Sequence, residues 1–340
     1  MTQNNNSNFN KMPSSKEVAA LAKVSQATVS RVFSGHTNIT EKTRRRVLEA
    51  AEKLGYRPNA MARSLTLNRS NLIALVTLDV VNPHYNAMIN KVADRIQKIG
   101  RELLYFVSRE EKNLDEVISQ VLQYRVDGII VHSAAISSHM AAECEKNQIP
   151  VVVFNKYTVN KNVMTVCSDN VRAGWMAANH FYDRGYRNFA FIGSHTFSAT
   201  SKDRLRGFKD ALYEKGIENC VTQMVPYTYE AGATAARTIL NEQKKIDAIF
   251  CAGDLLALGA IDVIKYEYGL QIPQDIAIIG FDNIEAASWP PYLLATFEQQ
   301  IDKMLDTTFN YLSKKLNGEV VDEGVELFEC TLIERNSAQL

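Results

Sequence analysis

A repeated pattern along residues 71–336 constrains the fold of this chain more than any other feature. Short apolar runs alternate there with amphipathic stretches, and the runs predicted to be strands are NLIALVTLDV, ELLYFVS, VDGIIVHS, PVVVFN, NFAFIGS, DAIFCAG and IAIIGFDN. Near-continuous apolar runs are typical of parallel strands that are covered on both faces. Helical patterns separate them at residues 86–99, 114–123, 172–184, 203–214, 231–242 and 256–267. Repeated strand–helix units predict α/β doubly wound parallel sheets, and the length of the segment predicts two lobes with a cleft between them.

Composition and short motifs exclude several classes of protein. The chain has 46% hydrophobic and 22% charged residues, as ordinary folded proteins do, and it lacks the run of about 18 apolar residues that a membrane span needs. Its five cysteines form no CxxC pair, which predicts reduced thiols in the cytoplasm and no metal site. No GxSxG, HExxH or P-loop motif is present, so we expect neither an enzyme nor a cofactor. Residues 1–12 are polar and asparagine-rich, which predicts a disordered lead rather than a signal peptide.

The charge is unevenly distributed along the chain. The net charge is zero, but residues 1–65 contain eleven Lys or Arg against four Asp or Glu, a net charge of +7. The remaining residues contain 27 basic and 34 acidic side chains, a net charge of −7. This split indicates a polyanionic partner for the N-terminal segment alone. The alternative is a chance cluster of charge on a solvated face.

Residues 13–57 predict three short helices. Ser14 and Glu17 fit a capping box for the first helix, Ser25 and Thr40 can cap a second and a third, and Gly55 ends the third at residue 54. Side chains expected to face inward are Val18, Ala19, Leu21, Ala22, Val24, Val29, Val32, Val47, Leu48, Ala51 and Leu54. Two short helices joined by a tight turn and supported by a third describe an all-α helix-turn-helix head. The alternative is a three-helix bundle whose polar face meets another protein.

The second helix of this head presents side chains that suit a DNA groove. Arg31 can donate two hydrogen bonds to guanine, Gln26 can pair with adenine, and Ala27 can contact a thymine methyl group. Thr28 and Ser30 can reach phosphates, which set the register of the protein on the duplex. The predicted DNA contacts of the head are therefore Ser25, Gln26, Ala27, Thr28, Ser30 and Arg31.

The segment EVAALAKVSQATVSRVFSGHTNITEKTRRRVLEAAEKLGYRPNAMARSL, residues 17–65, resembles the lac-repressor/purine-repressor (LacI/GalR) family of bacterial transcription regulators. The resemblance implies that Gln26, Ala27 and Arg31 touch bases. It also implies that residues 58–70, which are too few to form a stable helix alone, are a hinge helix and linker that order on operator DNA. In that reading Leu65 is a wedge in the minor groove, with Asn59 and Arg63 near the backbone or groove floor. The alternative is an ordinary polar linker.

The resemblance continues along residues 71–340, with landmarks such as NPHY, RLRGFKDAL, DLLALGAI and IIGFDN. It implies an effector-binding and dimerisation domain whose two lobes are of the periplasmic-binding-protein type. We expect the three crossovers between the lobes near residues 157–162, 285–290 and 317–323.

Several polar residues near predicted strand ends are candidate effector contacts. Arg204 matches the family's effector-binding arginine, Asp282 can accept two hydroxyl groups, and Tyr227 matches an aromatic stacking platform. The full set of candidates is Tyr85, Asn155, Arg204, Tyr227, Asp254, Asp282 and Gln299. Each could instead be ordinary core or surface structure. Many relatives carry Asn-Asp where this chain has Gly253-Asp254, a departure expected to leave room for a larger ligand.

These features predict a homodimeric repressor that binds a palindromic, double-stranded operator and responds to a small molecule. A sugar or sugar phosphate is the expected effector, since an arginine, an aspartate and an aromatic ring suit a polyhydroxylated ligand. Two alternatives stay open: a soluble carbohydrate-binding protein without operator function, and a family member that uses a protein or purine corepressor. A dimer rather than a tetramer is expected, because no leucine heptad follows LIERNSAQL.

Overall fold

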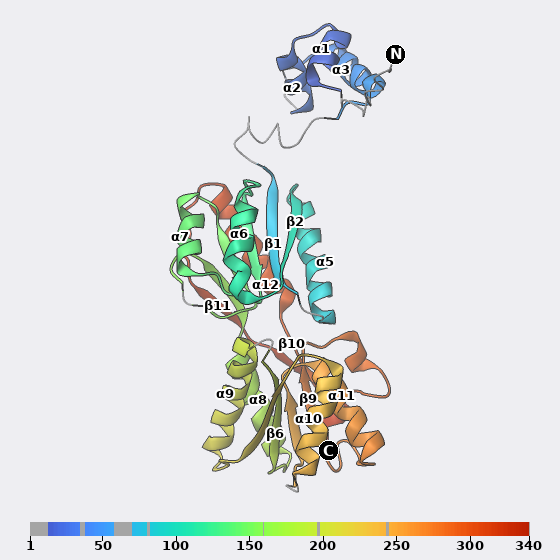
Figure 1. Cartoon of the computed structure of the whole chain (residues 1–340), viewed down its shortest axis with the longest axis vertical. Helices are drawn as coiled ribbons and strands as arrows, with labels where there is room; N and C mark the ends of the chain where they lie inside the picture. The colour runs from blue at the N-terminus through green and yellow to red at the C-terminus, as the bar shows by residue number, and fades with distance from the viewer. Residues whose placement is uncertain are drawn as a thin grey trace, which may run out of the picture. The chain divides into compact units, whose positions relative to one another are not determined.

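The computed structural model describes residues 13–34, 38–57, 70–79, 82–158, 160–195, 198–242 and 245–339 (Figure 1). Contacts divide the chain into two units, residues 1–70 and 71–340, which we treat separately and call the head and the body. The expected lead at residues 1–12 and the proposed hinge contacts Asn59, Arg63 and Leu65 lie outside the described residues. Within the described residues, no helix is long and apolar enough to cross a membrane.

The head contains the three predicted helices, α1 (Ser15–Ala22), α2 (Gln26–Phe33) and α3 (Glu41–Leu54). The capping box at Ser14 is present, and the hydroxyl groups of the α2 and α3 caps accept backbone N–H bonds as expected. Gly55 ends α3 in the left-handed region with φ +65°, which glycine adopts without a steric penalty. The predicted helix boundaries in the head are therefore confirmed.

The buried face of the head differs in part from the prediction. Leu21, Leu48 and Leu54 are 50%, 46% and 36% exposed, so the expectation that they face inward was wrong. On α3 the buried positions are Val47, Ala50 and Ala51. Successive helical residues are separated by about 100°, so Leu48 lies at the edge of the face formed by Val47, Ala50 and Ala51, and Leu54 is the last residue of the helix. The other buried members of this core are Val18, Ala19, Ala22, Val29 and Val32.

Lobe 1 of the body is built on a parallel six-stranded sheet in the order β11-β5-β4-β3-β1-β2. Its strands are β1 (Leu72–Leu78), β2 (Glu102–Ser108), β3 (Gly128–His132), β4 (Val151–Phe154), β5 (Met164–Ser168) and β11 (Val325–Phe328). Its helices are α5 (Pro83–Lys98), η1 (Glu111–Asn113), α6 (Leu114–Leu122), α7 (Ser138–Lys146) and α12 (Ile301–Leu316). Helices α5 and α12 pack on one face of the sheet, and α6 and α7 pack on the other.

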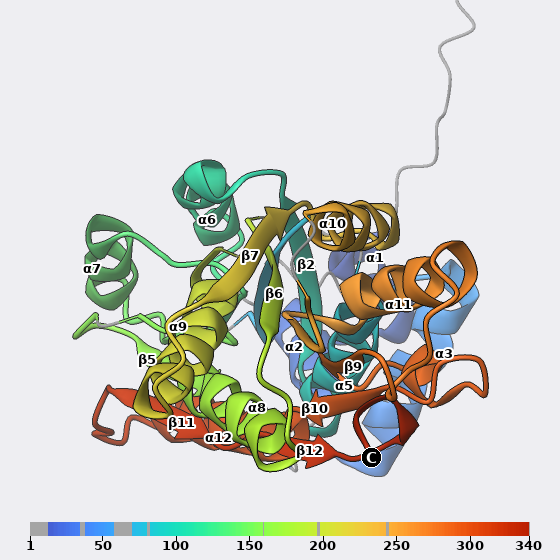
Figure 2. The same cartoon turned by 90° about the horizontal axis from the view of Figure 1, so that it is seen from below.

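Lobe 2 has a second six-stranded sheet in the order β12-β10-β9-β8-β6-β7, parallel except for β12. Its strands are β6 (Phe189–Ser194), β7 (Cys220–Val225), β8 (Ala248–Cys251), β9 (Ala277–Phe281), β10 (Ala295–Glu298) and β12 (Thr331–Ile333). Its helices are α8 (Asn170–Asp183), α9 (Ser198–Glu214), α10 (Tyr229–Asn241), α11 (Asp254–Asp262), η2 (Val263–Glu267), η3 (Glu285–Ser288) and η4 (Asn336–Ala338). Figure 2 shows α8 and α9 on one side of this sheet and α10 and α11 on the other.

The structure corrects all three predicted crossovers, those at residues 157–162, 285–290 and 317–323. Each of these segments joins neighbouring elements of a single lobe. The chain passes between the lobes at residues 168–170, 299–300 and 329–330. The true crossovers are very short and follow β5, β10 and β11, short strands that the apolar-run pattern did not predict. The sequence pattern instead places the crossovers at polar loops of ordinary length.

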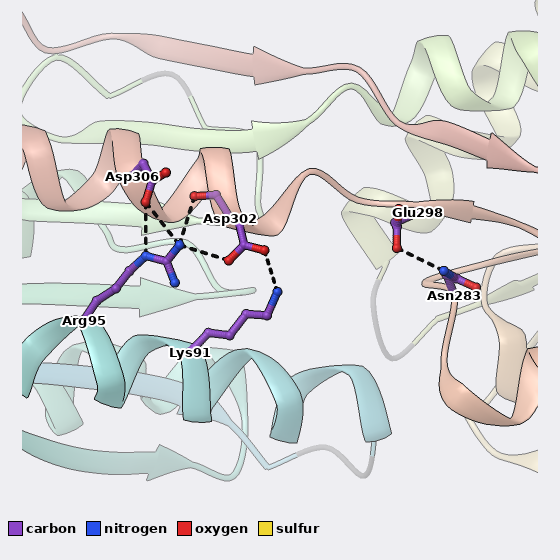
Figure 3. A network of polar contacts seen from close by, with 6 residues as sticks. All are labelled: Lys91, Arg95, Asn283, Glu298, Asp302 and Asp306. Atoms are coloured by element: carbon purple, nitrogen blue, oxygen red, sulfur yellow. Dashed lines mark hydrogen bonds and ion pairs between the residues drawn. The ribbon is translucent and has the colours of Figure 1, made fainter.

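Ion pairs tie α5 to α12 within lobe 1 (Figure 3). Lys91 Nζ lies 2.7 Å from Asp302 Oδ2, and Arg95 Nη2 lies 2.9 Å from Asp302 Oδ1 and 3.1 Å from Asp306 Oδ1. Each exposed pair contributes under about 1 kcal/mol alone, but a network of several charges is more effective. These ion pairs therefore hold the first turns of α12 against α5.

The residue before the second crossover is tied within lobe 2. Glu298, the last residue of β10, accepts a 3.0 Å hydrogen bond from Asn283 Nδ2 in lobe 2 (Figure 3). Because lobe 1 holds the start of α12 and lobe 2 holds the end of β10, only residues 299–300 lie between the two anchored parts.

Candidate nucleic-acid interface and inter-lobe cleft

The exposed face of α2 carries the side chains predicted to contact DNA. Val29 and Val32 are buried against α1 and α3, which leaves the opposite face of α2 to solvent. Thr28 is half-buried, and the exposed members of the predicted set are Ser25, Gln26, Ala27, Ser30 and Arg31. Ser25 Oγ accepts the backbone N–H of Thr28 at 3.1 Å and so caps the helix. Among the described residues the Arg31 guanidinium has no hydrogen-bond or ion-pair partner, so it is available to a ligand.

Gln26 is already engaged within the head. Its Nε2 donates a 2.8 Å hydrogen bond to Ser15 Oγ at the start of α1. This bond holds the first turns of the two helices together and leaves the amide oxygen of Gln26 free to accept. The second N–H of Nε2 is also available, so Gln26 can both donate to and accept from a base while it keeps the bond to Ser15.

Two arginines of α3 support the helix-turn-helix and were not singled out from the sequence. Arg46 Nη2 donates to the carbonyl oxygens of Ala22 and Lys23, at the end of α1. Arg44 Nη1 donates to the Val32 carbonyl oxygen at 3.5 Å. Carbonyl groups in the last turn of a helix lack intrahelical partners, and cations stabilise that end. These arginines therefore fix the turn before α2 and the end of α2, and the sequence pattern showed them only as positive charge.

A small cavity lies between the two lobes, at the carboxyl ends of the strands. Residues of lobe 1, lobe 2 and the 299–300 crossover line it: Asn82, Tyr85, Asn155, Ser194, Thr200, Ser201, Arg204, Tyr227, Ala252, Asp282 and Gln299. Its volume is about 20 Å³, the order of size that holds one water molecule. The structure therefore brings together six of the seven predicted effector residues, and the exception is Asp254.

Asp282 is the hub of the hydrogen bonds across this cavity. Its Oδ2 accepts bonds of 3.1 Å from Asn82 Nδ2 in lobe 1 and from the Tyr227 hydroxyl in lobe 2. Its Oδ1 accepts a 2.8 Å bond from Gln299 Nε2, and the Gln299 amide oxygen accepts from Ser168 Oγ at 2.9 Å. One carboxylate thus binds both lobes and the crossover between them.

Arg204, on α9, is a buried cation that is only 6% exposed, and its partners hold it in a fixed position. Its Nε donates a 2.8 Å hydrogen bond to Asn170 Oδ1, and its Nη1 donates to the Ala252 carbonyl oxygen. The guanidinium carbon lies 3.3 Å from the centre of the Phe281 ring, an arrangement that stabilises a buried cation. The side chain is therefore preorganised before any ligand arrives.

Lobe 1 contributes a buried aromatic wall that includes a residue missed from the sequence. The rings of Tyr85 and His132 pack edge to face with centroids 4.3 Å apart. Burial raises the pKa of Tyr85 and lowers the pKa of His132 to about 3, so both side chains are neutral. Within the described part of the chain, His132 Nδ1 and Asn155 Oδ1 are buried without a hydrogen-bond partner. Asn155 lines the cavity, so its oxygen is available to a ligand that donates a hydrogen bond.

Asp254 does not line the cavity, which corrects the expectation of an effector contact. It is fully buried at the start of α11. Its Oδ1 accepts a 2.5 Å bond from Thr296 Oγ1 on β10, and its Oδ2 accepts a 2.8 Å bond from the backbone N–H of Ile284. The carboxyl group thus joins α11 to the loop after β9, 30 residues away in the sequence, and to β10, 42 residues away.

The expected extra room at Gly253 is also absent. The ring of Tyr227 occupies the space beside Gly253, where a Cβ atom would lie 2.4 Å from the Tyr227 hydroxyl oxygen. The missing side chain is therefore replaced by an aromatic ring of this chain, and the cleft is not enlarged.

Comparisons with known proteins agree with this architecture. Residues 15–59 match the model of bacterial regulatory proteins of the lacI family, and residues 178–338 match the periplasmic binding protein-like domain. Catabolite control protein A of Priestia megaterium is 31% identical over 91% of this chain and 94% of its own length. The transcriptional repressor CytR of Escherichia coli (strain K12) is 29% identical over 95% of this chain and 96% of its own length. These relatives are transcription regulators rather than enzymes.

Solved structures support the same assignment. The lac repressor dimer bound to operator and the anti-inducer ONPF has a TM-score of 0.86 at 24% identity, and covers 97% of this chain and 100% of its own. The regulator CelR in complex with cellobiose has a TM-score of 0.70 at 26% identity, and covers 96% and 99%. The predicted fold, a helix-turn-helix head with two α/β lobes, is confirmed. The chain belongs to the lacI family of bacterial regulatory proteins.

Proposed function

We propose that this protein is a repressor that binds a palindromic operator as a homodimer and is controlled by a sugar in the inter-lobe cleft. The observation that carries the DNA-binding part is the exposed face of α2, where Arg31 has no described partner while α1 and α3 bury the opposite face. Residues 13–57 serve as the DNA-binding domain, 58–70 as the hinge and 71–340 as the effector-binding and dimerisation domain. Such a repressor acts in the cytoplasm, at the nucleoid.

The proposed DNA contacts are Ser25, Gln26, Ala27, Thr28, Ser30, Arg31, Asn59, Arg63 and Leu65. A dimer places two heads on two half-sites, so the symmetry of the protein matches the symmetry of the DNA. The lac repressor structure, a dimer on its operator, supports this arrangement for a chain of the same fold.

The proposed effector contacts are Tyr85, Asn155, Arg204, Tyr227, Asp282 and Gln299, all of which line the cavity. A ligand that hydrogen-bonds Asp282 replaces donors that belong to lobe 1, lobe 2 and the crossover. Ligand binding therefore changes the angle between the lobes. Coupling of this kind between two sites is typically worth about 1–3 kcal/mol and acts equally in both directions.

Fluorescence anisotropy with a pool of short palindromic duplexes at fixed salt, with and without sugars, tests the proposal. A sugar that shifts specific DNA binding is the expected result. Specific binding that no sugar affects would contradict control by a sugar, and folded protein without specific binding would contradict the repressor function itself.

Arg31→Ala is expected to weaken binding to the cognate operator by about 1–3 kcal/mol and to relax specificity at one base pair per half-site. Affinities of wild type and variant for cognate and singly substituted half-sites measure this effect. Arg45→Ala is the control, because Arg45 is an exposed α3 arginine paired with Glu49 at 3.1 Å. Loss of this charge is expected to change the affinity for all DNA sequences by the same factor. Equal discrimination by wild type and Arg31→Ala would refute the base contact.

Arg204→Met is expected to reduce sugar affinity at least tenfold, because a hydrogen bond from a buried charged group contributes about 1.5–3 kcal/mol. Methionine keeps much of the length and apolar volume of the side chain, and operator binding without ligand is expected to persist. The measurement is the sugar concentration that produces half of the maximal change in operator binding. The control is Arg237→Met, which removes an exposed arginine paired with Glu267. An unchanged half-effect concentration in Arg204→Met would exclude Arg204 as a contact.

A further inference from the structure

The Tyr227 ring and Gly253 fit each other closely. A Cβ atom on Gly253 would lie 2.4 Å from both Cε2 and the hydroxyl oxygen of Tyr227 and 2.8 Å from Cζ. No side chain at position 253 is compatible with this position of the ring, since real Cβ atoms do not approach other heavy atoms within 3.0 Å. The absence of a side chain at residue 253 is therefore the condition that lets the ring lie there.

The Tyr227 ring lines the lobe 2 side of the cavity. Tyr227 is 6% exposed, and its hydroxyl group donates to Asp282. The ring thus occupies the space next to the carboxylate that a ligand must reach. A ligand bound to Asp282 cannot extend past it in this direction while the ring stays in place, which favours a ligand with a single ring.

The charges that line the cavity balance. Arg204 and Asp282 are the only charged side chains among its described lining residues. Arg204 already uses Nε and Nη1 on Asn170 and Ala252 and lies against Phe281. A phosphate dianion would add two negative charges beside the Asp282 carboxylate without a further cation, and buried charge without a partner is strongly disfavoured.

The remaining polar groups suit hydroxyl donors. Asn155 Oδ1 is buried in the cavity wall without a partner among the described residues, and it can only accept. The Asp282 oxygens are also acceptors, and their present donors Asn82 and Gln299 can be exchanged for ligand hydroxyl groups. Acceptors on both lobes thus call for a ligand with several hydroxyl groups.

We propose that Tyr227 and Gly253 form a specificity-determining pair, which adapts this cleft to a neutral, single-ring polyol and excludes phosphate esters and disaccharides. This inference rests on the proposed function as a sugar-controlled repressor. Tyr227 contacts the ligand, and Gly253 is a positioning residue that acts through the tyrosine ring.

Calorimetric titration of the full chain tests the ligand class. The neutral probes are D-ribose, D-xylose, D-glucose and D-galactose, and the comparison probes are D-ribose 5-phosphate, D-glucose 6-phosphate, cellobiose and lactose. We expect at least one neutral monosaccharide to bind tenfold or more tightly than its phosphate ester and than either disaccharide. Tighter binding of a phosphate ester or a disaccharide would overturn the proposal, and so would failure of all four monosaccharides to bind.

Two variants test the pair. Gly253→Ala is expected to displace the Tyr227 ring and to lower the affinity for the preferred monosaccharide tenfold or more. Tyr227→Ala is expected to shift the ratio of disaccharide to monosaccharide affinity at least tenfold toward the disaccharide, a change that a purely structural role would not produce. Gly324→Ala is the matched control, because a Cβ atom there meets nothing within 4 Å. Unchanged monosaccharide binding by Gly253→Ala, or an unchanged ratio in Tyr227→Ala, would refute the pair.

Operator binding by each protein, measured in parallel without sugar, distinguishes a failure of the specificity pair from a failure of the repressor function. Specific DNA binding combined with the wrong ligand preference overturns the specificity pair and leaves the repressor function intact. Loss of specific DNA binding in folded wild-type protein contradicts the repressor function, whatever the titrations give.

Discussion

Gly207→Ala is expected to destabilise the body by about 3 kcal/mol, at the upper end of the usual cost of overpacking. Gly207 lies where α9 crosses α8, and a Cβ atom on it would lie 1.8 Å from the Val171 carbonyl oxygen. Gly174 makes the reciprocal approach on α8, where a Cβ atom would lie 2.0 Å from the Arg204 carbonyl oxygen. Alanine gains about 1 kcal/mol in helix propensity, but a clash between two backbones is relieved only if the helices separate.

Urea unfolding followed by circular dichroism measures the effect of Gly207→Ala. Because Arg204 lies one turn before Gly207 on α9, separation of the helices is also expected to weaken sugar binding. Gly324→Ala, at an exposed and uncrowded position, is expected to unfold like the wild type. A Gly207→Ala midpoint equal to that of the wild type would show that the two helices tolerate a wider spacing.

Raising the pH from 5 to 7 is expected to lower the stability contributed by Asp254 by up to about 3 kcal/mol. Burial, with the nearby Asp282 carboxylate, raises the pKa of Asp254 to about 8. An unfolded aspartate has a pKa of about 3.9, so between about pH 4 and pH 8 the folded protein keeps a proton that the unfolded chain has lost. Stability therefore falls as the pH rises through this window and is fully present below it.

Asp254→Asn is expected to flatten this pH dependence. The amide oxygen can accept from the Ile284 N–H, and the amide nitrogen can donate to Thr296 Oγ1, because a hydroxyl group both donates and accepts. The free energy of unfolding at pH 5, 6, 7 and 8 measures the difference between wild type and variant. Asp210→Asn, at an exposed aspartate of α9, is the matched control. Parallel pH profiles for wild type and Asp254→Asn would show that the buried carboxyl group is not the source.

The helix boundaries of the head were predictable because caps and hydrophobic periodicity are local. A cap such as Thr40 binds the N–H of Thr43, three residues away, so both partners are visible in one short stretch. The packing face of α3 was less certain, because Leu48 and Val47 are both apolar and only the position of α1 and α2 decides which of them is buried.

In the body, too, some elements were predictable from local patterns and others were not. Continuous apolar runs predicted the central strands, whereas β5, β7, β10, β11 and β12 were missed. The three edge strands among them, β7, β11 and β12, have no fully buried residue, so the contrast with loops is weak. The crossovers follow β5, β10 and β11, so they were misplaced because these strands were not predicted; only β11 is an edge strand, and the other two are short strands of four or five residues.

The sequence by itself determined the helix-turn-helix, the α/β class of the body and the family motifs that carry Arg31, Arg204 and Asp282. Only the tertiary structure decided what surrounds each polar group. Asp254 is a buried linker because Thr296 and Ile284 lie beside it, and Gly253 adds no space because Tyr227 fills it. Local patterns specify the backbone through contacts within a few residues. The role of a side chain depends on partners that meet only after the sheets assemble, 26 residues away for Gly253 and 42 for Asp254.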